Sequence, residues 1–304
     1  MIEKLRQQGI SQSLLYKVEK YRENIETDDK YKYRIPDDDV IYLGKDVWEQ
    51  AIAALLQGEN ILLVGPKSTG KNLLATNLAQ LFARPSWNIS LNINTDESQL
   101  IGTDTFLNNQ VVFRDGPIAL AAKYGGFAIL DEINMAKNEA LSILHSTLDD
   151  RRILDISGYD IINLHEMTRF IATMNYGYLG TRDLNEALVS RFMVIEMPVI
   201  KDEYLLNLIL NKYPTIKPEM ADSFVNIFKD IELKVQNSEI SSKALDLRGL
   251  LSSIGTMQMG LSPRQALKIG ISNKAFDKFE EELIDDIVKL NIPDSIKRTD
   301  IFNE

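Results

Sequence analysis

The sequence predicts an α/β fold in which a parallel sheet lies between two layers of helices, followed by a small all-helical domain. The sheet is predicted by short apolar runs such as Phe127–Leu130, since continuous apolar strands are typical of a sheet that is covered on both faces. These runs alternate with stretches of helical spacing up to Pro198, which favours a three-layer αβα sandwich. Beyond Pro198 the apolar residues keep helical spacing, and no convincing strand follows.

Three regions are expected from these patterns. Residues 1–40 combine an amphipathic helix or a broken helical pair, over 2–26, with a charged and tyrosine-rich linker. Residues 41–198 are expected to form the αβα core, and residues 199–304 the helical domain.

The elements are predicted in order from their spacing and from the residues that end them. The first core helix ends at Gly58, because glycine readily takes the left-handed conformation of a helix end. Two hairpins are expected, one with an arm at 111–113 and one over 151–164. The expected strands are 60–64, 87–93, 127–130, 170–174 and 193–197. The expected helices are 45–57, 71–82, 117–123, 136–148 and 184–192, and then 202–212, 218–235, 245–258, 263–272 and 280–287.

Composition excludes several kinds of site. The 304 residues include no cysteine, which excludes disulfides and thiolate metal sites, and two histidines are too few for an imidazole metal centre. Any metal is therefore expected to arrive with a bound ligand. The net charge of −10 argues against nonspecific binding to DNA or anionic lipid. No apolar run approaches the roughly 20 residues that a bilayer requires, and the N-terminus lacks an apolar signal core, so we expect a cytoplasmic protein.

A glycine-rich loop follows the first core strand. Gly65 and Gly70 bracket four residues, so that backbone N–H groups can curl around a β-phosphate, and Lys71 follows to reach the β and γ oxygens. The helix that begins there points the positive end of its dipole at the same phosphates. Asn72 stands where Ser or Thr usually gives Mg²⁺ a hydroxyl, and its amide oxygen is also a possible ligand for a hard cation. The predicted nucleotide-binding residues are Gly65, Pro66, Lys67, Ser68, Thr69, Gly70, Lys71 and Asn72.

Polar residues end the next two buried strands. Asp131 and Glu132 follow the run 127–130, and carboxylates at the tip of a buried strand are costly unless they are used. In open α/β sheets ligands bind outside the carboxyl ends of the strands, where these two side chains would project beside the glycine-rich loop. Asn175 ends the following strand, and its amide either orients a water or belongs to an ordinary turn.

Four motifs together resemble those of the AAA+ ATPases and, within them, of the MoxR group and its CbbQ/NorQ-like branch. The loop Gly65–Lys71 resembles Walker A, and Ile129–Asn134 resembles Walker B with the Asp-Glu-Ile-Asn signature of the group. Ala172–Asn175 is similar to the sensor 1 strand, and Ala187–Phe192 to the arginine-finger box. The resemblance covers about residues 40–270 and implies a P-loop ATPase core with a helical lid.

The resemblance implies a role for each matching residue. Lys71 would hold the β- and γ-phosphates of ATP, and Asp131 would hold Mg²⁺ together with Asn72. Glu132 would polarise the attacking water, and Asn175 would position that water against the γ-phosphate.

Three arginines are candidates for further contacts with the nucleotide. The resemblance implies that Arg191 crosses into the site of the neighbouring subunit. For sensor 2 we prefer Arg248 to Arg264, because the family places this arginine on the third lid helix, although a Ser-Pro-Arg triplet carries it in other members. Arg182 is either a second trans-acting cation or a solvated surface residue. Among the polar neighbours, Asn134 is expected to cap a helix and Thr173 to pack or hydrogen-bond within the sheet.

The resemblance implies Mg²⁺-dependent ATP hydrolysis by a ring, a homohexamer, that remodels or activates a protein partner. The expected partner is a von Willebrand factor A domain protein, and the segments 95–126 and 151–165 resemble insertions that usually face a central pore or a partner. A rival hypothesis is a nucleotide-switched assembly scaffold in which Asn72 weakens hydrolysis. A third, a motor on nucleic acid, is disfavoured by the net charge and by the absence of a basic tract.

Overall fold

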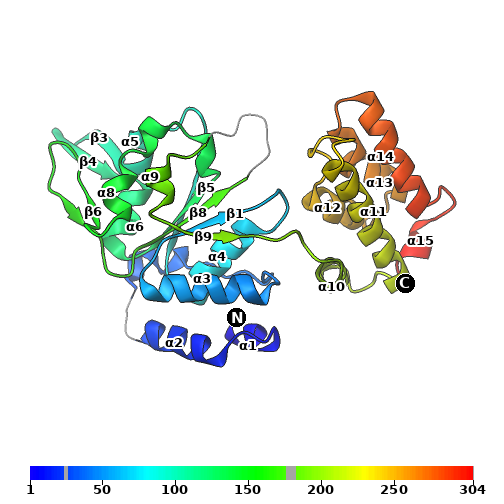
Figure 1. Cartoon of the computed structure of the whole chain (residues 1–304), viewed down its shortest axis with the longest axis horizontal. Helices are drawn as coiled ribbons and strands as arrows, with labels where there is room; N and C mark the ends of the chain where they lie inside the picture. Colours follow the sequence, from blue (N-terminus) through cyan, green and yellow to red (C-terminus); the bar gives the residue numbers. More distant parts are fainter. Residues whose placement is uncertain (24–26, 176–182, 304) are drawn as a thin grey trace. The chain divides into compact units, whose positions relative to one another are not determined.

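The computed structural model describes residues 1–23, 27–175 and 183–303. The chain divides into two compact units, of which the first contains Met1–Pro66 and Gly70–Pro198 and the second contains Lys67–Thr69 and Val199–Glu304. The first unit is built on a sheet and the second is helical (Figure 1).

A five-stranded parallel sheet forms the centre of the first unit and confirms the predicted fold class. Its strand order is β2-β5-β8-β1-β9. Val64 of β1 pairs with Met174 of β8, and Leu130 of β5 pairs with Ala172 of β8, so the carboxyl ends of these three strands lie at one edge of the sheet. The strands are β1 (Ile61–Val64), β2 (Ser86–Ser90), β5 (Phe127–Asp131), β8 (Arg169–Met174) and β9 (Met193–Glu196).

Helices cover both faces of this sheet, because successive strand residues point to opposite sides. Ile61 and Leu63 belong to one buried cluster with α1 to α4, whereas Leu62 belongs to a second cluster with α5 to α9. The helices of the first cluster are α1 (Ile2–Gln7), α2 (Gln12–Glu23), α3 (Lys45–Gln57) and α4 (Lys71–Leu81). Those of the second are α5 (Glu97–Ile101), α6 (Pro117–Tyr124), α7 (Asn138–Leu141), α8 (Leu144–Leu148) and α9 (Glu186–Val189).

The N-terminal arm is a pair of helices that packs on α3. Leu5 of α1 and Leu15 of α2 are buried in the same cluster as Trp48 of α3. The stretch expected as a linker contains a 3-10 helix, η1 (Asp29–Arg34), and its Tyr31 is buried with its ring 5.4 Å from that of Trp87. The arm therefore adds to the hydrophobic core of the first unit.

The prediction of one helix over 136–148 is wrong. The structure has a 3-10 turn, η2 (Ile133–Met135), followed by the separate short helices α7 and α8. The hydroxyl of Ser142, which lies between these helices, donates to the carbonyl of Glu139 at 2.7 Å, and serine bonds of this kind compete with the helical backbone. Both predicted hairpins are confirmed, as β3 (Gly102–Leu107) with β4 (Gln110–Asp115), and β6 (Ile153–Leu154) with β7 (Ile162–Asn163).

The second unit is an assembly of helices around its own buried core. That core includes Ile209 of α10, Phe224 of α11 and Ile254 of α12. The N–H of Asn303, which follows α15, donates to the carbonyl of Thr215 in the turn between α10 and α11 at 2.7 Å. The elements are α10 (Asp202–Lys212), α11 (Pro218–Gln236), α12 (Leu247–Gln258), α13 (Pro263–Gly270), η3 (Ser272–Lys274), α14 (Lys278–Asn291) and α15 (Arg298–Ile301).

A membrane-spanning helix is not found in the part of the chain that the structure describes, since none of its helices combines the length and the apolar character that a bilayer requires.

Candidate active site

The glycine-rich loop begins where β1 ends and stops at the first turn of α4. The N–H of Gly65 donates to the carbonyl of Met174, the last residue of β8, at 3.2 Å. Gly70 caps α4 in a left-handed conformation with φ 83°, and a Cβ there would lie only 3.1 Å from the ring of Tyr42. Both the backbone angle and the close ring require glycine at position 70.

Lys71 lies inside the loop that precedes it. Its ammonium donates to the carbonyl of Gly65 at 2.9 Å and to that of Pro66 at 2.6 Å, and the residue is buried. Burial lowers the pKa of Lys71 to about 8, although the charges of Asp131 and Glu132 oppose that shift. Phosphate oxygens in the loop would favour the charged form of the amine.

Asp131 receives hydrogen bonds at both carboxylate oxygens. The Asn72 amide nitrogen donates to Oδ2 at 2.7 Å, and the Thr173 hydroxyl donates to Oδ1 at 2.6 Å. A carboxylate has about four positions at which it can accept, so these two donors orient Asp131 and leave lone pairs for a cation or a water. Helix α4, strand β5 and strand β8 each contribute one of the three side chains.

Glu132 has a backbone conformation that is uncommon for a residue other than glycine. Its φ of 55° and ψ of 50° lie in the left-handed region, which costs on the order of 1–3 kcal/mol and persists only where surrounding contacts hold it. Its N–H donates to the Thr173 hydroxyl at 3.0 Å, and its carboxylate accepts from the Asn175 amide at 3.1 Å. Such strain is often found at functional sites.

Asn134 supports Asn175 and does not cap a helix, so the expectation for this residue is wrong. Its amide nitrogen donates to the backbone carbonyl of Asn175 at 2.8 Å. Its amide oxygen is buried and has no hydrogen-bond partner among the described residues. Asn134 therefore links the 3-10 turn after Glu132 to the residue that follows β8.

The side chains at this edge fit a hard divalent cation such as Mg²⁺. The Asn72 nitrogen is directed at Asp131, which leaves the amide oxygen of Asn72 able to act as a ligand. Oxygen donors of this kind, a carboxylate and an amide, are those that Mg²⁺ prefers in proteins. The residues thus match a metal that arrives with a nucleotide.

The structure brings most of the predicted site residues to one edge of the sheet. Lys71, Asn72, Asp131, Glu132 and Asn175 meet there through the contacts above. The predicted loop residues Lys67, Ser68 and Thr69 are grouped with the second unit. The assigned roles of all these residues stay predictions.

Arg191 makes its contacts away from this edge of the sheet. The Arg191 guanidinium donates to the carbonyls of His145, at 3.0 Å, and Ala187, and lies 3.8 Å from Asp149. Arg191 thus contacts α8, the turn after it and α9, none of which carries a predicted phosphate or metal ligand.

Both candidates for sensor 2 belong to the second unit. Arg264 of α13 forms an ion pair with Asp294, whereas Arg248 is exposed on the first turn of α12. The choice between them stays a prediction. Arg182 lies outside the described residues.

The expectation that Thr173 packs or hydrogen-bonds within the sheet is confirmed, because its buried hydroxyl donates to Asp131 of the neighbouring strand β5; the sequence did not identify that partner. The signal was available in part, because Thr173 lies near the carboxyl end of its strand, at the edge of the sheet where the acidic residues of β5 also end. What the sequence did not reveal is the register that places Thr173 beside Asp131, one residue beyond the pair Leu130 and Ala172.

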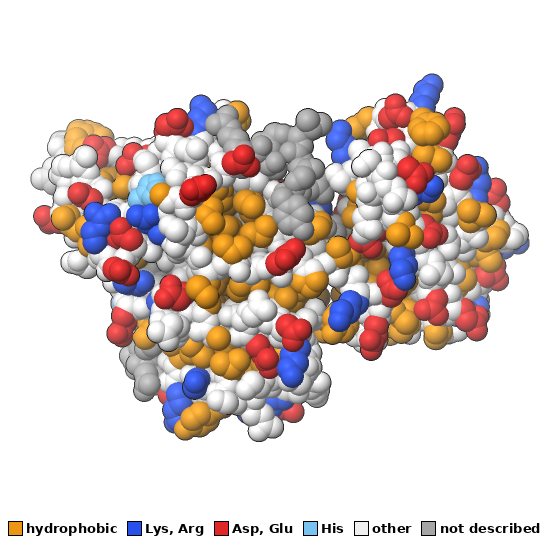
Figure 2. Space-filling view, in the orientation of Figure 1, with side chains coloured by type: hydrophobic (Ala, Val, Ile, Leu, Met, Phe, Trp, Pro, Cys, Tyr) orange, Lys and Arg blue, Asp and Glu red, His pale blue; other side chains and the backbone are white. Residues whose placement is uncertain are grey.

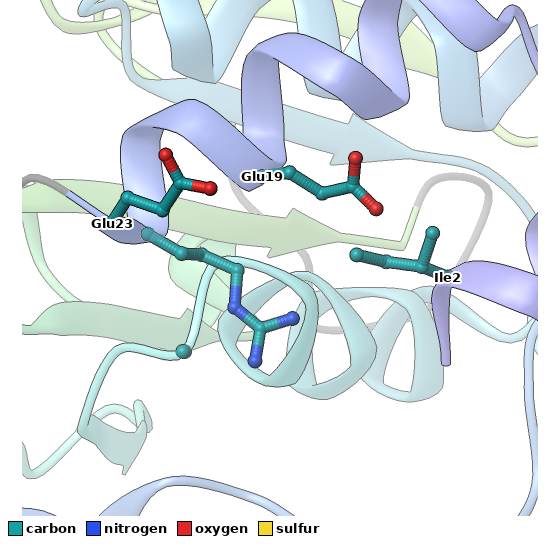
Figure 3. Close-up of a pocket in the computed structure, with 5 residues that line it drawn as sticks. Ile2, Glu19 and Glu23 are labelled. Carbon is teal, nitrogen blue, oxygen red and sulfur yellow. The ribbon is translucent and has the colours of Figure 1, made fainter.

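A separate surface hollow of about 560 Å³ lies on the first unit (Figure 3). It is lined by Ile2, Glu19, Arg22, Glu23 and Ala83. Ala83 follows the C-terminal end of α4, whereas the glycine-rich loop precedes its N-terminal end, and the 11 residues of α4 are about 16 Å long. This hollow is therefore distinct from the candidate active site.

Comparisons with known proteins agree with the geometry. The family model of the AAA domain, dynein-related subfamily, matches residues 60–192. The uncharacterised protein YojN of Bacillus subtilis is 34% identical over 245 residues, covering 79% of this chain and 80% of its own length. An uncharacterised protein of Staphylococcus saprophyticus is 33% identical over 261 residues, covering 82% and 98%. A crystal structure of a candidate ATPase from Cytophaga hutchinsonii has a TM-score of 0.45 at 17% identity, over 88% of this chain and 87% of that one.

Proposed function

We propose that this chain, which belongs to the AAA domain family in its dynein-related subfamily, is a Mg²⁺-dependent ATPase that forms a ring and remodels or activates a protein partner. The observation that carries the proposal is the chain of hydrogen bonds from Asn72 through Asp131, Thr173 and Glu132 to Asn175. These bonds orient two carboxylates and an amide next to a loop suited to phosphates.

The residues of this chain would divide the work of hydrolysis. Asp131 and the Asn72 oxygen would hold Mg²⁺, which when bound neutralises charge on the β- and γ-phosphates. Lys71 would leave the carbonyls of Gly65 and Pro66 and pair with the phosphate oxygens. Glu132 would accept a hydrogen bond from the attacking water and Asn175, which already contacts Glu132, would align that water.

The assembly part of the proposal is a homohexamer in which Arg191 reaches a neighbouring site. It rests on the resemblance of Ala187–Phe192 to the arginine-finger box of MoxR-type proteins. The Arg191 guanidinium is held by two carbonyl groups and one carboxylate, and a phosphate, which accepts two parallel guanidinium bonds, would compete with these contacts.

The partner in this proposal is a protein, and a von Willebrand factor A domain protein is the one that the MoxR resemblance implies. Exposed apolar side chains at the end of the β3–β4 hairpin support a protein contact, since Phe106 is 71% exposed and Val111 63%. This hairpin is joined to the loop between β6 and β7, where the Tyr159 hydroxyl donates to Asp104 and the Tyr159 ring lies 4.8 Å from Phe113.

Acidic and basic side chains are interspersed over the first unit on the face drawn in Figure 2. Together with the net charge of −10, this distribution favours a protein partner over nucleic acid.

A nucleotide-switched scaffold with weak hydrolysis is a second candidate. One observation favours it, because Asn72 replaces the usual hydroxyl and its nitrogen is engaged with Asp131. A steady-state turnover measurement with ATP and Mg²⁺ separates the two, since a scaffold would bind ATP without repeated turnover.

The proposed hydrolysis is tested with Glu132→Gln. Glutamine keeps the oxygen that accepts from Asn175 but loses the charge that polarises water, so the variant should bind ATP and turn over at least ~10²-fold more slowly. Wild-type turnover in this variant would overturn the assignment of Glu132. Lys71→Ala is the matched comparison, because it should abolish ATP binding itself in a calorimetric titration.

A further inference from the structure

The Thr173 hydroxyl contacts both acidic residues of the candidate active site at once. It donates to Asp131 Oδ1 at 2.6 Å and accepts from the backbone N–H of Glu132 at 3.0 Å. Thr173 is fully buried in β8, the strand that lies between β5 and β1. A hydroxyl has one proton to donate, and a carboxylate and an N–H leave only one way to arrange this pair of bonds.

The first of these bonds orients the metal-binding carboxylate. With Oδ1 held by Thr173 and Oδ2 held by Asn72, the plane of the Asp131 carboxylate is defined by donors on two different elements. Without the hydroxyl, Oδ1 of Asp131 would lose its partner, and the bond from Asn72 to Oδ2 would be left to orient the carboxylate. Groups that orient a metal ligand in this way typically change metal affinity or activity by about 10- to 100-fold when they are removed.

The second bond holds the proposed water-polarising residue in its strained conformation. Glu132 has a left-handed backbone conformation, and its N–H donates to the Thr173 hydroxyl. A hydrogen bond of this kind offsets part of the strain. Because the Glu132 backbone sets where its carboxylate meets Asn175, the hydroxyl also determines the position of that pair.

We propose that Thr173 is a positioning residue that couples the metal-binding carboxylate of Asp131 to the water-polarising carboxylate of Glu132. This inference rests on the proposed function and deepens it. If Thr173 only filled space, valine, which has nearly the same shape but no hydroxyl, could replace it. If the hydroxyl positions the two carboxylates, valine could not replace it, so the packing role and the positioning role predict different results.

The test compares Thr173→Val, Thr173→Ser and a matched control, Thr168→Val. Thr168 lies in the turn just before β8 and is also fully buried. Its hydroxyl donates to the carbonyl of Ala121 at 2.9 Å. Each variant is measured for turnover of ATP, for the Mg²⁺ concentration at half-maximal turnover, and for the affinity of a non-hydrolysable ATP analogue with Mg²⁺ and with EDTA. The binding measurement separates the metal-dependent part of affinity from the part that the loop and Lys71 supply.

We expect Thr173→Val to lose about 10- to 100-fold of the affinity gain that Mg²⁺ provides, and to lose turnover, while its affinity in EDTA changes little. Thr173→Ser should restore both. Thr168→Val should lower the melting temperature and leave the Mg²⁺ dependence as in the wild type. Should Thr173→Val not fold, Thr173→Ala replaces it with the same expectation.

The inference is overturned if the Thr173 variant without a hydroxyl keeps the Mg²⁺ dependence of the wild type, or if Thr168→Val shifts that dependence equally. Failure of the proposed function is distinguishable from either result, because the wild-type protein itself would then show no Mg²⁺-dependent turnover of ATP.

Discussion

Replacing Asn72 by threonine tests how an amide serves in place of the usual hydroxyl. The threonine hydroxyl is attached one bond nearer to the backbone than the amide nitrogen, so its oxygen would lie roughly 4 Å from the Asp131 oxygen that Asn72 now reaches at 2.7 Å. That separation is too long for a hydrogen bond. The pair is exposed, and losing it should cost about 1 kcal/mol in the absence of nucleotide, which lowers the melting temperature by roughly 2 °C.

With nucleotide and Mg²⁺ the expectation is reversed. A hydroxyl is the commoner Mg²⁺ ligand in this loop, so Asn72→Thr should bind ATP as the wild type does and turn over at an equal or higher rate. Thermal unfolding without ligand, calorimetric binding of ATP and steady-state turnover measure the three quantities. Asn72→Leu is the control, because it loses the same hydrogen bond and offers no ligand, and it should lose the metal-dependent part of affinity.

A tenfold or larger loss of turnover in Asn72→Thr would refute this reasoning. It would mean that the bond between Asn72 and Asp131 has a function that a hydroxyl cannot replace, and it would strengthen the scaffold hypothesis.

Two further predictions concern the ring and the second unit. If Arg191 acts in trans, Arg191→Ala and Glu132→Gln should each be inactive, and random mixing of the two should restore activity at up to about a quarter of the interfaces; verified mixed rings without activity would contradict a trans role. Burial raises the pKa of Asp246, but the Lys274 ammonium and the N–H of Gly249 outweigh it and hold the pKa below its usual value. Because this folded-state pKa is depressed, Asp246 stabilises the fold above its unfolded pKa and loses that effect as the pH falls through its folded pKa. Asp246→Asn should therefore lower the melting temperature more at pH 7 than at pH 3, and an equal difference at both values would count against this ion pair.

The elements of the first unit were largely predictable because their signals are local. The apolar run Phe127–Leu130 is buried on both sides in the structure, as its continuous hydrophobicity predicts. The helix that ends at Gly58 does so in the left-handed conformation that glycine permits, with φ 102°. The helix expected over 136–148 failed for an equally local reason, since the Ser142 hydroxyl competes for a helical carbonyl.

The sequence by itself determined which chemical groups are present and at which strand ends they stand. The bracket formed by Gly65 and Gly70 and the pair of carboxylates Asp131 and Glu132 are contiguous patterns, and their chemistry follows from residue type and spacing. Tertiary structure alone decided that the Thr173 hydroxyl meets Asp131, 42 residues away in sequence, because the pairing of β5 with β8 depends on contacts between distant parts of the chain. The same is true of Asn72 and Asp131, which a turn of α4 and the end of β5 bring within 2.7 Å. Spacing along a chain specifies local geometry, whereas hydrogen bonds between neighbouring elements depend on how those elements pack.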